Sequence, residues 1–148
     1  MSSTTQRKLL LSIRPKFAEM ILNGSKRVEL RRIGPRITAG DHVYLYVSSP
    51  VRALAGKFVV DGVAAAPVDS LWEAVKEHAG ISREHFDNYY SGVTHGHAIF
   101  VKTSSRLPSP IGLDVLRRIW RGFRPPQSYA YLSDDALRLL EDDVPCKQ

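Results

Sequence analysis

Short apolar and alternating runs dominate the chain, and they predict more strands than helices. Residues 9–13 are almost entirely apolar, which is typical of a buried strand. Residues 42–47 alternate aliphatic residues with Tyr44 and Tyr46, and residues 53–63 form a longer β-like segment with a bend or bulge expected at Gly56. Further strands are predicted at residues 27–31, where apolar and charged positions alternate as on a half-exposed strand, at 96–102 and at 128–132.

Between these strands, apolar residues recur at the spacing that is typical of helices. Pro15 suits the first position of a helix that ends at Asn23-Gly24. Other helices are predicted over residues 68–79, 82–90 with Ser82 as the cap, 113–120 and 134–140, with a turn at 107–110 and an extended segment at 122–127. Since most strands follow one another without a crossover helix, we expect an α+β fold: a mainly antiparallel β-barrel of five to six strands with peripheral helices.

The chain has 148 residues, enough for one domain with its own core, and it shows no repeat. We expect a core over residues 9–132 and an acidic C-terminal helix and tail over 133–148. The only cysteine, Cys146, excludes an intramolecular disulfide and suits the reducing cytoplasm. No apolar stretch approaches 18 residues, and the leucine run near the N-terminus is too short for a signal peptide, so no membrane association is expected.

Positive charge is concentrated in the first nine-tenths of the chain. The net charge is +6, but residues 133–148 hold five acids against two bases, which leaves 19 bases and 10 acids in residues 1–132. Such an excess favours contact with phosphates and accelerates encounters with polyanions. The pattern indicates RNA or another single-stranded nucleic acid as the partner, although charge that serves only solubility would look the same.

The densest basic segment surrounds one acid. Five of the 21 lysines and arginines lie within residues 26–36, around Glu29. Arg31 and Arg32 offer forked donors to phosphate, and Lys26 offers a compact charge. Residues three apart on a strand face opposite ways, so Lys26 and Glu29 meet only if Lys26 lies in the turn after Gly24. A solvated strand with Glu29 paired to a neighbouring arginine explains this segment equally well.

Three other segments carry candidate binding residues. A strand end that leads into a helix N-terminus is a favourable place for an anion, and tyrosines beside bases can stack on nucleobases. Surface charge, half-buried tyrosines and a structural strap are the simpler explanations. The candidates are Ser12, Arg14 and Lys16 at the first helix, Tyr46, Ser48 and Ser49 at the end of the strand over residues 42–47, and Arg124, Gln127, Ser128 and Tyr129 beyond the arginine-rich segment that includes Arg117, Arg118 and Arg121.

Common catalytic and cofactor motifs are absent from the sequence. It contains no P-loop, no dinucleotide-binding glycine motif and no serine-nucleophile elbow. His95 and His97 would share one face of a strand, but no third ligand lies near them in the sequence. We therefore predict neither a metal nor a cofactor.

Four stretches together resemble the ASCH domain family, over residues 9–132. The resemblance implies a PUA-like β-barrel with helices around a cleft that binds RNA or nucleotides, with Lys26, Glu29 and Arg31 lining it. The stretches are Ser12-Ile13-Arg14-Pro15-Lys16-Phe17-Ala18-Glu19, Gly24-x-Lys26-x-x-Glu29-x-Arg31-Arg32, Tyr46-x-Ser48-Ser49-Pro50 and Pro125-Pro126-Gln127-Ser128-Tyr129.

The resemblance also raises two enzymatic hypotheses. Some ASCH proteins are N4-acetylcytidine amidohydrolases, and their catalytic lysine matches Lys26. They carry a threonine nucleophile where this sequence has Glu29, and a later glutamate for which Glu73 and Glu77 are the candidates. An adjacent carboxylate favours the charged form of a lysine, so this pair favours binding over nucleophile activation, while Glu29 could still act as a general base on water. Other ASCH proteins are ribonucleases.

The sequence therefore predicts binding of RNA, another single-stranded nucleic acid or a nucleoside in a basic cleft. A hydrolase acting on nucleic acid, either amidohydrolase or ribonuclease, is the alternative, and a regulatory domain that binds a small molecule is the second alternative. The predicted binding residues are Ser12, Arg14, Lys16, Lys26, Arg31, Arg32, Tyr46, Ser48, Ser49, Arg124, Gln127, Ser128 and Tyr129, and the predicted catalytic residues of an enzyme are Lys26, Glu29 and Glu77.

Overall fold

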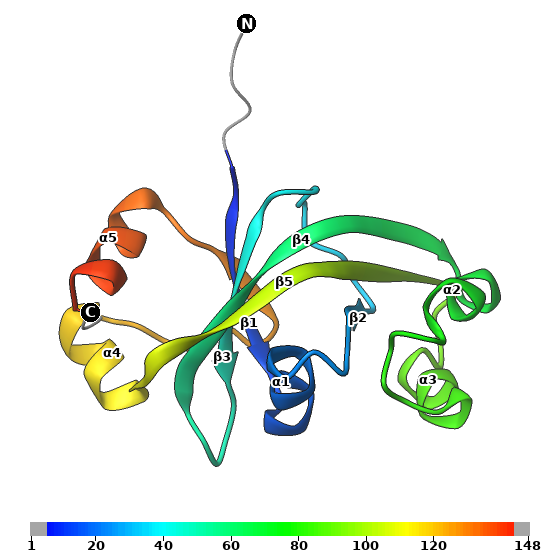
Figure 1. Cartoon of the computed structure of the whole chain (residues 1–148), viewed down its shortest axis with the longest axis horizontal. Helices are drawn as coiled ribbons and strands as arrows, with labels where there is room; N and C mark the ends of the chain where they lie inside the picture. Colours follow the sequence, from blue (N-terminus) through cyan, green and yellow to red (C-terminus); the bar gives the residue numbers. More distant parts are fainter. Residues whose placement is uncertain (1–5, 144–148) are drawn as a thin grey trace, which may run out of the picture.

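The computed structural model describes residues 6–143, which form six strands and five helices around one mixed sheet. The strand order is β2-β5-β4-β3-β1-β6, and the sheet curves into a half-barrel (Figure 1). The elements are β1 (Lys8–Ile13), α1 (Pro15–Leu22), β2 (Val28–Arg31), β3 (His42–Val47), β4 (Ala53–Pro67), α2 (Val68–Val75), α3 (Arg83–Tyr89), β5 (His95–Gly112), α4 (Leu113–Ile119), β6 (Tyr129–Tyr131) and α5 (Asp134–Asp143).

The sheet is almost entirely antiparallel. Only β1 and β3 run parallel, and the other neighbouring strands of the described chain pair antiparallel. The predicted α+β class with a PUA-like, mainly antiparallel barrel is confirmed, although the barrel is a half-barrel. No helix within residues 6–143 is long and apolar enough to span a membrane. Cys146 lies outside the described residues.

The two longest strands, β4 and β5, form a ribbon that crosses the whole molecule (Figure 1). Helices α2 and α3 lie at one end of the ribbon, and α4 and α5 lie at the other. The predicted bulge at Gly56 is confirmed, because the register shifts between Leu54 and Gly56. The predicted turn at residues 107–110 is wrong, since β5 continues through them. The prolines of this segment lie where β5 has no register partner in β4. A proline at such a position costs no hydrogen bond between the strands.

Three apolar clusters hold the elements together. The central one packs α1 against the sheet, a second lies under α4 and α5, and a third joins α2 and α3 to β2 and β5. A strand is confirmed at residues 28–31, but the prediction that it is half-exposed is wrong for its central residues. Val28 and Leu30 are buried in the third cluster, and Glu29 is buried on the opposite face beside Ile99. Both faces of β2 are covered, which neighbouring residues in the sequence do not reveal.

Candidate nucleic-acid interface

A cleft of about 400 Å³ opens where β1 and β3 end. These are the parallel strands of the sheet, so their carboxyl ends open to the same side, the usual place for a ligand in such an arrangement. Helix α1 starts just beyond Ser12 without a side-chain cap or an acid in its first turn. The cleft is lined by Ser12, Tyr46, Ser48, Ser49, Arg52, Leu113, Arg117, Pro125, Pro126 and Gln127.

Residues 124–128, which we call the strap, line one part of this cleft and are anchored on both sides of Gln127. The Ser12 hydroxyl donates to the Pro126 carbonyl at 2.5 Å, and the Ser12 amide donates to the Ser128 carbonyl at 3.0 Å. The Arg31 guanidinium donates to the Ser128 hydroxyl. Gln127 itself is exposed and lines the cleft, so its backbone is fixed while its amide group stays free for a ligand.

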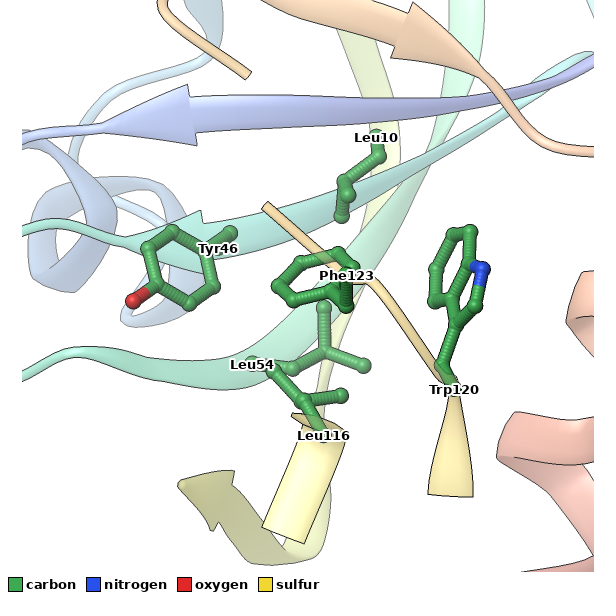
Figure 2. A pocket seen from close by; sticks show the side chains of 6 residues that line it. All are labelled: Leu10, Tyr46, Leu54, Leu116, Trp120 and Phe123. Atoms are coloured by element: carbon green, nitrogen blue, oxygen red, sulfur yellow. The ribbon is translucent and has the colours of Figure 1, made fainter. Parts of the chain in front are cut away.

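Tyr46 borders both this cleft and an apolar cluster. Its ring is 3% exposed and lies 6.2 Å from the ring of Phe123. Figure 2 shows its hydroxyl pointing away from Phe123 and Trp120. Within the part of the chain that the structure describes, that hydroxyl has no hydrogen-bond partner. Because Tyr46 lines the cleft, its hydroxyl is available to a ligand or to solvent in the cleft.

Two guanidinium groups act on the Tyr46 hydroxyl. Burial raises the pKa of Tyr46, while the positive charges of Arg52 and Arg117 lower it and partly offset that effect. Tyr46 also comes from β3, Arg52 from the loop after it and Arg117 from the last turn of α4, so three separate segments converge here. The cleft therefore combines two cations with a buried hydroxyl, a set suited to a phosphate group.

Arg52 was not among the residues predicted from sequence. Its φ of 52° lies in the left-handed region, which is uncommon for a residue other than glycine and often found at functional sites. Its carbonyl accepts a hydrogen bond from Leu113 at 3.0 Å, which ties the loop to α4. The only signal in the sequence was a base after Ser48-Ser49-Pro50. Arg117 was noted as basic but not assigned to the site.

The Lys26–Glu29 pair lies in the protein interior. Lys26 is in the turn after Gly24, where it has to be to meet Glu29. It is 3% exposed, donates to the Ala79 carbonyl at 2.5 Å and sits 5.1 Å from the centre of the Phe17 ring. Neither Lys26 nor Glu29 lines the cleft.

Burial controls the charge of this pair. It lowers the pKa of Lys26, and Glu29 raises that pKa by less. Glu29 thus acts on Lys26 in the expected direction, and burial opposes it. Burial also raises the pKa of Glu29, against the opposing effects of Arg31 and Lys26. Arg31 donates to the Glu29 carboxylate at 3.1 Å and thereby connects the interior pair to Ser128 in the strap.

The remaining predicted residues are distributed around this core. Arg14, Lys16 and Arg124 are exposed. Arg32 is exposed and donates to the Tyr89 carbonyl at 3.2 Å. Tyr129 pairs with Leu11 in the sheet and packs against the central cluster, which favours the simpler explanation for this tyrosine.

The two candidate glutamates are both exposed. Glu73 forms an ion pair with Lys76 at 2.8 Å, and Glu77 follows the end of α2. Neither glutamate lines the cleft. The structure therefore separates them from the residues it gathers around Tyr46.

The half-barrel and the cleft at its parallel strand ends define a PUA-like protein. The chain belongs to the ASCH domain family, whose sequence model matches residues 11–104. This confirms the family resemblance, and the first three of the four stretches lie within the matched residues.

Similar proteins include proteins of Zymomonas mobilis and Ureaplasma parvum. An ASCH domain-containing ribonuclease of Zymomonas mobilis is 27% identical over 135 residues, which cover 91% of this chain and 90% of that protein. The crystal structure of ASCH from Zymomonas mobilis has a TM-score of 0.87 at 27% identity, covering 93% of this chain and 96% of that one. The large ribosomal subunit protein uL22 of Ureaplasma parvum is 27% identical over 129 residues, 86% of this chain but 40% of that protein.

Proposed function

We propose that this protein binds single-stranded RNA, with one nucleotide held in the cleft at the ends of β1 and β3. One observation carries this proposal: the buried Tyr46 hydroxyl has no partner among the described residues and is influenced by Arg52 and Arg117. A phosphate would supply the acceptor that this hydroxyl needs and the negative charge that the two guanidiniums attract.

The other residues of the cleft suit the rest of a nucleotide. Gln127 presents an amide donor and acceptor to a base edge, and Ser48 and Ser49 offer hydroxyls that can meet a ribose. The relatives support an RNA partner, because one is named a ribonuclease and another a ribosomal protein. Lys26 and Glu29 act in this proposal from the interior, through Arg31 and the strap, without touching the RNA.

Salt-dependent binding tests this proposal. We expect affinity for a labelled single-stranded RNA, measured by fluorescence anisotropy, to fall steeply with added salt. Arg52→Ala and Arg117→Ala should each weaken binding and reduce the slope of log affinity against log salt by about 0.7. Arg27→Ala is the matched control, because Arg27 is exposed, basic and close in sequence to Lys26 but outside the cleft. A loss of slope in the control alone would contradict the proposal.

RNA cleavage is a second candidate, favoured by the name of the Zymomonas mobilis relative. Guanidiniums that hold a phosphodiester can also stabilise the extra negative charge of its transition state. The 2′-hydroxyl oxygen would bond to the adjacent phosphorus while the bond from phosphorus to the 5′-oxygen breaks. The 2′-proton would pass to water and the 5′-oxygen would take a proton, which leaves a 2′,3′-cyclic phosphate and a 5′-hydroxyl.

The identity of the products tests the cleavage hypothesis. We expect labelled RNA to yield 2′,3′-cyclic phosphate ends with the wild type, while the all-deoxy oligonucleotide stays intact. Arg117→Ala should slow cleavage by about 100-fold, and Arg27→Ala should not slow it. RNA that stays intact with the wild type but still binds would leave binding as the function.

A further inference from the structure

Charge is distributed unevenly along the long axis of the molecule. The α4 end carries an arginine-rich segment: residues 113–128 contain four arginines and one acid, Asp114. At the other end of the β4–β5 ribbon, residues 68–90, which include α2 and α3, contain five acids against one lysine and one arginine. Figure 1 places α4 and α2 at opposite ends of the molecule. Helix α5, which packs against α4 at the same end, adds five acids and one arginine, so positive charge there is confined to the segment from Arg117 to Arg124, and it is this segment that attracts a polyanion.

The arginines near α4 have no acid partner among the residues whose side chains the structure describes. Arg117, Arg118, Arg121 and Arg124 are all exposed, and none forms an ion pair with the described residues. Some exposed arginines elsewhere are paired, as Arg83 is with two aspartates and Arg106 is with Glu19, while others, such as Arg27 and Arg36, are single charges without an ion pair among the described residues. What distinguishes the α4 segment is that its four arginines lie within eight residues. Four arginines within eight residues repel one another, so their positions favour a ligand with several negative charges.

The segment that carries these arginines is fixed by two aromatic side chains. The ring of Trp120 lies 4.8 Å from the ring of Phe123, and the Phe123 amide donates to the Trp120 carbonyl at 3.0 Å. Phe123 is buried against Tyr46, as Figure 2 shows. Arg121 and Arg124 are thus presented next to anchored residues, so less side-chain and backbone freedom is lost when they bind.

From these observations we infer that the ligand is a strand of several nucleotides, whose phosphates beyond the cleft lie along Arg118, Arg121 and Arg124. This inference rests on the proposed RNA-binding function and names its substrate class: a single-stranded oligonucleotide in preference to a free nucleotide. Arg117, which lines the cleft, connects the two parts of the path. Helix α5 packs against α4 and carries the acids Asp134 and Asp135 in its first turn.

A length series tests the inference. Affinity for adenylate oligomers from one to about eight nucleotides is measured at several salt concentrations, starting with adenosine 5′-monophosphate. We expect affinity to rise with each added phosphate and then level off. The triple variant Arg118→Ala, Arg121→Ala, Arg124→Ala should lose about tenfold or more in affinity for the longer oligomers and about 2 from their salt slope, with the monophosphate affinity unchanged.

A second triple variant separates this path from net charge. Arg27→Ala, Arg36→Ala, Lys102→Ala removes the same charge from exposed residues outside α4 and the strap, and it should leave most of the length dependence in place. Equal losses in both triple variants would overturn the inference, and so would an affinity that does not change with length. Absence of binding at every length would instead overturn the proposed function itself.

Discussion

The Ser12 hydroxyl donates a hydrogen bond to the carbonyl oxygen of Pro126, 2.5 Å away, although 114 residues separate the two in the chain. Ser12 lies near the end of β1, directly opposite Tyr46 in the parallel pair β1–β3. One serine therefore links β1 to the strap, and it does so next to Tyr46, which also lines the cleft.

Ser12→Ala should loosen the strap. Loss of the hydrogen bond leaves the Pro126 carbonyl without this donor and should reduce the free energy of unfolding by about 1 kcal/mol. RNA affinity should fall several-fold, because part of the binding free energy then goes into ordering Gln127. Urea unfolding and anisotropy measure the two effects. Ser104→Ala is the matched control, since its hydroxyl donates to the Ile21 carbonyl at 2.9 Å away from the cleft. An equal loss of affinity in the control would contradict the role of Ser12.

Tyr46→Phe should separate binding from stability. Removing a buried hydroxyl that lacks a partner should leave the free energy of unfolding unchanged or raise it by up to about 1 kcal/mol, whereas RNA affinity should fall. Tyr90→Phe provides the opposite pattern, because the Tyr90 hydroxyl donates to the carbonyls of Arg31 and His97, both at 3.2 Å. That variant should lose stability by about 1 kcal/mol or more and keep its affinity per folded molecule. A destabilised Tyr46→Phe would show that its hydroxyl is structural.

Glu29→Gln should change how stability depends on pH. The pKa of Glu29 in the folded protein lies above its ordinary value of 4.5, because burial disfavours the carboxylate. Above pH 4.5 the folded state then binds more protons than the unfolded state, so the free energy of unfolding falls as pH rises through the raised pKa. Glutamine resembles the protonated carboxyl and does not titrate.

Denaturant unfolding at a series of pH values above 4.5 shows whether the free energy of unfolding falls as pH rises. The wild type should lose stability relative to Glu29→Gln as pH rises from 4.5. Lys26 has the opposite effect, since its lowered pKa makes stability increase as pH approaches 10.5. A difference between the two proteins that grows in favour of the wild type with rising pH would show that its ion pair with Arg31 outweighs burial.

Gln127→Ala should alter base preference more than affinity. An amide that contacts a base edge contributes to discrimination, whereas phosphate contacts carry the salt dependence. We expect the affinities for the four homopolymeric RNAs to converge, with the salt slope unchanged. Gln6→Ala is the control, because Gln6 is exposed and donates to the Gly40 carbonyl outside the cleft. Homopolymer affinities that keep their original ratios would exclude Gln127 from base recognition.

The local pattern of the sequence determined most of the secondary structure. Alternation and apolar runs located five of the six strands closely, and Pro15 with Asn23 delimited α1. The exceptions have nonlocal causes. β5 runs through its prolines because residues 107–110 have no register partners in β4, and β2 is buried on both faces because distant elements cover it. The basic character and the family were also evident from the sequence alone.

Only the tertiary structure decided which polar residues share the cleft. The sequence singled out Lys26 and Glu29, but folding buries both. Burial lowers the pKa of Lys26 and raises the pKa of Glu29, which in each case favours the neutral form. It brings Arg52 and Arg117 to Tyr46 instead, from segments that lie far apart in the chain. The physical reason is that desolvation and convergence depend on contacts between distant residues, such as Ser12 with Pro126, and a linear pattern of charges carries no record of these contacts.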